Sequence, residues 1–332
     1  MQSEEPSIRW KIRVHVLKEN PASPGLLQLQ NEIKNSSRVK KLLSNKNSTG
    51  KIISQRNVYD KWQGAHWILA TLADIGYPPG DHSLIAAKDQ ILDFWLSPHY
   101  YKEFKADKKV KAYQKEGVPV MNGKYRRCAS QQGNALYMLL KLGLEDKRID
   151  NLVDRLLCWQ WPDGGWNCDK NPAAKHSSFM ETLLPVRGLA LYAKIKNDKQ
   201  IEEVVKKAAE VFLKRNLFKS QRTGEIIHKE FTQLHYPLYW HYDILGGLKV
   251  MAEAGLINDP GCVDALDLLQ SKMLLGGGWP AEGSYYKVSD TFQLSADYMN
   301  WGGASKYKMN EWITADALFV LKNAKRFDNL IK

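Results

Sequence analysis

The densest group of side chains that could do chemistry lies in the stretch 235–243, which reads HYPLYWHYD. Pro237 suits the first turn of a helix, and spacings of three and four would place two tyrosines and Asp243 on one face of that helix. Aromatic faces stabilise cations, and a carboxyl group that they shield from water has a raised pKa. The stretch therefore predicts a cation-stabilising pocket in which Asp243 is the acid and His235 and His241 tune it. The aromatic residues expected to line this pocket are Tyr236, Tyr239 and Trp240.

The same residues allow a structural interpretation, in which the aromatic side chains are core and Asp243 only pairs with a neighbouring cation. A second chemistry is also open, because the chain carries thiol, imidazole and carboxylate groups that suit Zn²⁺. These potential ligands are Cys168, Asp169, His176, His235, His241 and Asp243. Zinc is the one cofactor that the sequence suggests, with Cys168 and His176 as its candidate ligands. The alternative is a buried thiol at Cys168 and a loop histidine at His176.

The elements that must position these residues are helices. Apolar residues recur at helical spacing, and in three places an apolar helix ends at a glycine, Gly76, Gly143 or Gly255, before a second helix begins. The pattern predicts tandem helical hairpins from residue 61 to residue 332, preceded by an N-terminal helical extension over residues 1–60. The predicted helices cover 6–17, 26–43, 85–96, 149–159, 179–195, 201–218, 263–270 and 312–323.

One turn between hairpins occurs twice. Residues 156–168 read LLCWQWPDGGWNC, and residues 266–279 read LDLLQSKMLLGGGW, so both copies carry Leu-x-x-x-Gln followed by Gly-x-Trp. The glycines allow a tight turn, and the tryptophan is expected to fold back onto the helix just completed while the glutamine bonds the backbone of the turn. The repeated turn predicts a tie between neighbouring hairpins.

This repeat resembles the QW motif of squalene-hopene cyclases and, more loosely, the repeats of protein prenyltransferase β subunits. The resemblance implies an all-α fold, an α/α toroid in which the first helices of the hairpins line a central cavity. It also implies that an isoprenoid-like apolar ligand is bound or transformed there. The chain lacks the Asp-x-Asp-Asp motif with which those cyclases start catalysis. A binding or scaffold protein on the same frame, or a zinc-dependent enzyme, is therefore an open alternative.

An isoprenoid diphosphate would need cations or helix N-termini near the mouth of the cavity. Further substrate-binding candidates are accordingly Arg126, Arg127, Arg187 and Trp312.

The 332 residues carry a net charge of +12, four cysteines and 44% hydrophobic residues. This composition predicts a globular cytoplasmic protein with reduced thiols. The charge would permit peripheral contact with an anionic membrane, whereas no nucleic-acid-binding motif accompanies it. Phosphate-binding glycine loops and a Gly-x-Ser-x-Gly elbow are absent from the sequence, which argues against nucleotide-driven and serine-hydrolase chemistry.

Overall fold

The structure is a computed structural model that describes residues 3–327. Helices account for 49% of the residues, which confirms the all-α class. The helices of the main body are α4 (Ala65–Asp74), α5 (Ile85–Trp95), α8 (Ala129–Lys141), α9 (Arg148–Trp159), α10 (Phe179–Lys196), α11 (Lys199–Leu213), α12 (Ile244–Glu253), α13 (Val263–Ser271) and α14 (Glu311–Asn323). Six of these, α5, α9, α10, α11, α13 and α14, lie where the sequence predicts a helix, to within a few residues. The other three, α4, α8 and α12, each end two residues before one of the predicted terminal glycines.

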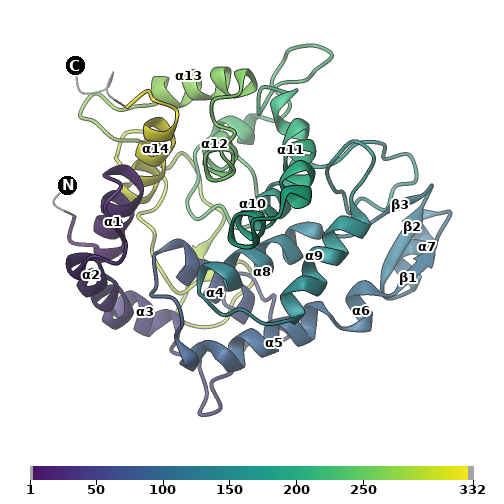
Figure 1. Ribbon diagram of the computed structural model, residues 1–332, viewed down its shortest axis with the longest axis horizontal. Helices are drawn as coiled ribbons and strands as arrows, with labels where there is room; N and C mark the ends of the chain where they lie inside the picture. The colour runs from purple at the N-terminus through teal and green to yellow at the C-terminus, as the bar shows by residue number, and fades with distance from the viewer. Residues whose placement is uncertain (1–2, 328–332) are drawn as a thin grey trace.

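The strands are short, and β1 (Glu103–Lys105), β2 (Val118–Met121) and β3 (Lys124–Tyr125) lie at one edge of the helical body (Figure 1). These three strands form one small sheet, in which β1 and β2 are parallel and β2 and β3 antiparallel. Two further strands, β4 (Lys287–Val288) and β5 (Ala296–Asp297), pair in parallel. Short helices α6 (Pro98–Tyr101) and α7 (Lys109–Gln114) accompany the first sheet.

Within each hairpin the two helices differ in burial. In α8 eleven of the thirteen residues are buried, whereas α9 buries only one stripe of five residues. Figure 1 shows α5 and α13 at the periphery, with α4, α8, α10 and α12 nearer the middle. The more completely buried helix of each hairpin is therefore the one whose side chains can meet those of the other hairpins.

Helices α8 and α10 approach each other closely. A Cβ atom on Gly133 would lie 2.3 Å from the backbone nitrogen of Pro185, and a Cβ atom on Gly188 would lie 2.5 Å from the carbonyl oxygen of Gly133. Only glycine fits at these two positions, because any side chain would push the backbones apart.

The repeated turn makes the same contacts in both copies. The indole Nε1 of Trp166 donates to the carbonyl oxygen of Leu156 at 2.9 Å, and Nε1 of Trp279 donates to that of Leu269 at 2.7 Å. The expected fold-back of the tryptophan onto the preceding helix is thus confirmed twice. In the first copy Gln160 donates to the backbone of the turn, as predicted.

The second glutamine behaves differently. The side-chain oxygen of Gln270 accepts a hydrogen bond from the guanidinium of Arg326, so this part of the prediction holds only for the first copy. A second feature common to both copies was not foreseen. The backbone amides of Trp166 and Trp279 donate to the hydroxyls of Thr182 and Thr314, which lie in the first turn of the next buried helix.

The N-terminal segment is helical, with α1 (Pro6–Lys11) continued as a π-helix (Ile12–Val16), then α2 (Pro24–Asn35) and α3 (Ser37–Leu42). The single helix predicted over 26–43 is wrong, because Ser36 has an extended backbone and its hydroxyl caps the new helix at Val39. The π-helix packs against α14, and the buried residues of α1 share one core with the main body. No helix within residues 3–327 is long and apolar enough to cross a lipid bilayer.

Candidate functional site

The stretch 235–243 forms turns rather than a helix, so the prediction that Pro237 opens one is wrong. The helix α12 begins only at Ile244, because Asp243 is its N-cap and accepts a hydrogen bond from the backbone amide of Gly246 at 2.8 Å. Tyr236, Tyr239 and Asp243 therefore do not share a helical face. They nevertheless meet, because the turns bring all three to one cavity.

Asp243 is buried, with 1% of its side chain exposed. Each of its carboxylate oxygens accepts a hydrogen bond from a backbone amide. Besides capping α12, it accepts a hydrogen bond from the backbone amide of His235 at 2.8 Å and lies 3.3 Å from the ring Nδ1 of the same histidine. A carboxylate with these bonds holds the turns in place and fixes the imidazole ring.

The central cavity has a volume of about 110 Å³ and is lined by α4, α8, α10, α12, α14 and the turns 235–243. Its walls are apolar and aromatic. They include Trp67, Leu183, Leu184, Leu245, Tyr236 and Tyr239. Each wall comes from a different part of the chain, so the cavity exists only in the folded molecule.

The base of the central cavity is a network of buried charges. The ammonium of Lys249 lies 2.8 Å from a carboxylate oxygen of Asp74 and 2.8 Å from one of Asp316. Lys11 reaches the same two carboxylates from α1, at 3.1 Å and 2.9 Å. Two lysines and two aspartates from four helices thus form a closed set with no net charge.

Arg187 extends this network. Its guanidinium makes a two-pronged contact with Glu253 at 2.6 and 2.8 Å, bonds the hydroxyl of Tyr137 at 2.9 Å and lies 3.6 Å from Asp74. The hydroxyl of Tyr236 donates to Asp74 at 2.9 Å. With Arg187 and Glu253 included, three cations face three anions.

These interactions keep the acids of the network ionised. Burial by itself would raise the pKa of Asp74, but attraction to Lys11, Lys249 and Arg187 outweighs it, and the pKa lies well below its ordinary value. The pKa of Asp316 is lowered in the same way by Lys11 and Lys249 against burial. Neither aspartate can serve as a proton donor near neutral pH.

Tyr239 is the most unusual residue of the central cavity. Its backbone has a φ angle of +53°, a left-handed conformation that bulky residues rarely adopt. Its ring stacks on Trp62 at 3.7 Å between centroids, and its hydroxyl donates to Asp297 at 2.5 Å. Burial raises the pKa of Asp297, although hydrogen bonds from Tyr239 and Trp301 oppose the rise. The pair places an oriented hydroxyl at the cavity wall, beside a carboxyl group that takes up a proton more readily than usual.

A second cavity of about 290 Å³ lies on the other side of the charge network, along the C-terminal halves of the same helices and next to α1. It shares Asp74, Arg187, Lys249 and Asp316 with the central cavity. Its other lining residues include Lys141, with no ion pair among residues 3–327, and His15, whose pKa is lowered to about 3 by burial and then by nearby lysines. More cations line this second cavity than the central one, and it is called the cationic cavity below.

The structure brings together five of the residues predicted for the site. Those that line the central cavity are His235, Tyr236, Tyr239, Asp243 and Arg187. Trp312 lies behind the wall, where it stacks on Tyr236 with ring centroids 5.1 Å apart. Trp240 and His241 stack on each other outside the lining, and burial lowers the pKa of His241 to about 4.

The two predicted arginines at the mouth lie elsewhere. Arg126 is buried over Trp161 and bonds the carbonyl oxygen of Ala174, and Arg127 lies over Tyr100. Neither lines the central or the cationic cavity, because both are packed among aromatic rings at the start of α8.

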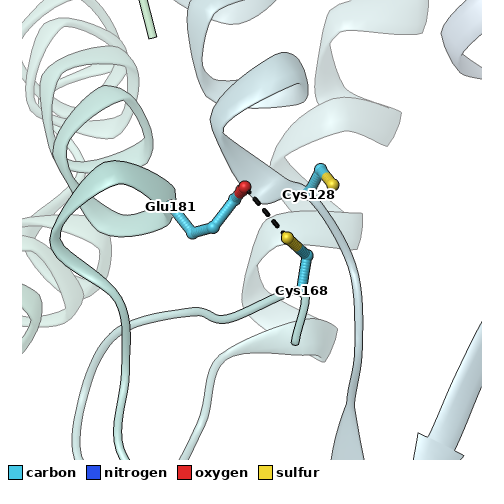
Figure 2. A group of neighbouring side chains, drawn as sticks. All are labelled: Cys128, Cys168 and Glu181. Atoms are coloured by element: carbon cyan, nitrogen blue, oxygen red, sulfur yellow. Dashed lines mark hydrogen bonds between the residues drawn. The ribbon is translucent and has the colours of Figure 1, made fainter. Parts of the chain in front are cut away.

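The predicted metal ligands separate as well. His176 is exposed and lies outside the one cluster of three potential metal ligands in residues 3–327. Cys168 belongs to that group, but its neighbours are Cys128 and Glu181 (Figure 2). The structure therefore places Cys168, but not His176, in a cluster of potential metal ligands.

The residues missed by sequence reasoning are the charges of the network. Asp74, Asp316 and Lys249 each stand as a charge within an otherwise apolar stretch of a helix, whereas Lys11 lies between two further cations, Arg9 and Arg13. An isolated charge in a buried helix needs a partner, so this pattern was the available signal. The partners themselves come from helices far apart in the sequence.

No protein-family model matches this chain, and no curated protein matches it.

Proposed function

We propose that the chain is an α/α toroid of the terpenoid-cyclase and prenyltransferase type, and that its central cavity binds a small isoprenoid-like molecule. The observation that carries the proposal is the convergence of five helices and the turns 235–243 on one apolar, aromatic cavity with a charged base. A ligand with a hydrocarbon body and one polar end suits such a lining, because the walls favour apolar groups and the base offers hydrogen bonds.

The size of the central cavity restricts the ligand. An engineered apolar cavity of about 150 Å³ accepts benzene, so about 110 Å³ suits a group of about five or six heavy atoms. One isoprene unit has this size, whereas a squalene-sized chain does not fit. Burial of five apolar carbons contributes about 4 kcal/mol, which corresponds to a dissociation constant on the order of 1 mM.

Catalysis requires a proton donor at the cavity. Asp74 and Asp316 are held ionised, so they are excluded from this role. Asp243, proposed from the sequence as the acid, already accepts hydrogen bonds at both oxygens, so its proposed role becomes that of orienting His235. The proposed donor is Tyr239, whose phenolic hydroxyl gives its proton to the ligand and takes one from the protonated carboxyl group of Asp297.

The test is a titration of the untagged full chain with dimethylallyl alcohol, geraniol and farnesol, followed by ligand-observed NMR. Ala70 lines only the central cavity, and Ala190 lines the cationic one. Ala70→Phe should abolish binding of dimethylallyl alcohol, while Ala190→Phe should leave it unchanged. Equal binding by both variants would contradict the proposal, as would tighter binding of farnesol by a site that Ala70→Phe does not affect.

A further inference from the structure

Three side chains of the kinds that bind metal ions meet outside both cavities. The thiols of Cys128 and Cys168 and a carboxylate oxygen of Glu181 all lie within 4.8 Å of one another. Figure 2 shows that they come from three separate segments: the start of α8, the loop after the repeated turn at Trp166, and the first turn of α10. Such a convergence places two sulfur ligands and one oxygen ligand around a common point.

The spacing suits a tetrahedral zinc ion. With Zn–S bonds of about 2.3 Å and Zn–O bonds of about 2.0 Å, tetrahedral ligands lie about 3.5–3.8 Å apart. The Sγ atom of Cys168 lies 3.2 Å from Oε1 of Glu181, close to that separation. Small rotations of the three side chains would therefore bring all three ligand atoms to bonding distance.

Glu181 is held in a ligating orientation. Its Oε2 atom accepts hydrogen bonds from the backbone amide of Ser130 at 3.1 Å and from the hydroxyl of the same serine at 2.9 Å. These bonds turn the other oxygen, Oε1, toward Cys168. Support of this kind behind a ligand is typical of metal sites.

The surroundings also suit negatively charged ligands. Cys128 is the N-cap of α8, whose helix dipole favours negative charge at that end. Arg127 is buried and close enough to oppose the rise that burial causes in the pKa of Glu181. Two thiolates and one carboxylate carry three negative charges, which a divalent ion and the Arg127 guanidinium balance.

We propose that Cys128, Cys168 and Glu181 bind one Zn²⁺ ion per chain through three protein ligands. Both cysteines are partly exposed, so the fourth coordination position is open to water or to a ligand. Glu181 lies one turn before the cavity residue Leu184 on α10, which places the ion beyond the rim of the central cavity. This inference does not depend on an isoprenoid ligand.

Metal binding displaces the thiol protons. Without metal, the hydrogen bond with Cys128, burial and the Glu181 charge all raise the pKa of Cys168, so the group is protonated. Formation of the two Zn–S bonds releases both thiol protons to solvent, with no change in oxidation state. Zinc affinity should accordingly rise with pH.

The experiment is metal analysis of the untagged full chain, followed by removal of the metal and titration with Co²⁺. The expected result is one zinc per chain and, with Co²⁺, the absorption bands of cobalt–thiolate bonds. Cys128→Ser and Cys168→Ser should remove these bands, and Glu181→Gln should weaken binding at least about tenfold. Cys158→Ser is the matched control, because Cys158 is an exposed free thiol on α9.

Three results would overturn the proposal. The first is a metal-free chain that binds neither Zn²⁺ nor Co²⁺ in the reduced state. The second is binding that Cys128→Ser and Cys168→Ser leave unchanged, which would place the ion elsewhere. The third is a native Cys128–Cys168 disulfide that persists in the cellular protein. The cobalt spectrum of the wild-type chain keeps the test valid even where a variant fails to fold.

Discussion

At the scale of single residues, the charges at the centre of the molecule are stable only as a set. Lys249 and Lys11 each contact both Asp74 and Asp316, so removal of one of them leaves only one lysine between the two buried carboxylates. A buried ion pair adds little stability over apolar residues, but breaking one is costly because the remaining charge has lost its compensation.

Lys249→Met should lower the free energy of unfolding by about 3–5 kcal/mol, as measured by urea denaturation. Lys206→Met is the matched control, because Lys206 pairs with Glu203 on the exposed surface of α11 and should cost less than about 1 kcal/mol. The double variant Lys249→Met/Asp316→Asn should recover part of the loss. Equal stability of the Lys249 and Lys206 variants would show that the network does not support the fold.

Asp243→Asn tests the structural role of the Asp243 carboxylate as a hydrogen-bond acceptor. An amide has one oxygen where the carboxylate has two, so its NH₂ group would face either the backbone amide of Gly246 or that of His235. The expected loss in the free energy of unfolding is about 1–3 kcal/mol. If Asp243 acted only as an acid, the same variant would lose turnover and keep its full stability.

Much of the residue-level site was accessible from the sequence, and its limits are physical. The cluster of aromatic residues and Asp243 predicted a cavity lining, and five of the predicted residues do line one. The charge network could not be predicted from the sequence, because the pairing of its charges depends on how four helices far apart in the chain pack together. Glu181 was not among the predicted metal ligands, whereas its carboxylate faces Cys168.

At the scale of elements, periodicity predicted the helices well because each buries a continuous apolar stripe. It failed where a single side chain decided the backbone. Ser36 divides α2 from α3 by capping the second helix. Asp243 caps α12, which therefore begins at Ile244 rather than at Pro237. Caps act through one hydrogen bond, so hydrophobic periodicity does not reveal them.

The contact of α8 with α10 gives an element-scale prediction. Gly133→Ala should lower the free energy of unfolding by about 3 kcal/mol, since the new Cβ atom would meet the backbone of Pro185 at 2.3 Å. Gly276→Ala is the control, because open space surrounds that glycine and no left-handed backbone angle is required there. Thermal or urea unfolding measures both. If Gly133→Ala left the free energy of unfolding unchanged, α8 and α10 could not be packed as closely as the structure shows.

At the scale of the whole molecule, buried histidines link stability to pH. Burial lowers the pKa of His66 to about 3, so it stays neutral in the folded chain, where it accepts a hydrogen bond from Trp95. In the unfolded chain a histidine titrates near pH 6.5. Between about pH 6.5 and 3 the unfolded state therefore binds more protons, and stability falls as the pH is lowered.

At pH 5 this difference amounts to about 2 kcal/mol for His66, relative to its contribution above pH 7. Urea unfolding across this range should show the decline, and His66→Gln should reduce its slope. Exposed His176 is the control, because His176→Gln should leave the slope unchanged. A decline that began only below about pH 4 would assign the effect to carboxylates such as Asp74 and Asp316 instead.

The most direct test of the central claim is a crystal structure of the chain soaked with dimethylallyl alcohol. Density for the alcohol is expected among Trp67, Leu184 and Tyr239, with its hydroxyl toward the charge network. The density should be absent from Ala70→Phe crystals soaked in the same way. Alcohol density in the cationic cavity instead, or a central cavity filled only with ordered water, would contradict the proposed function.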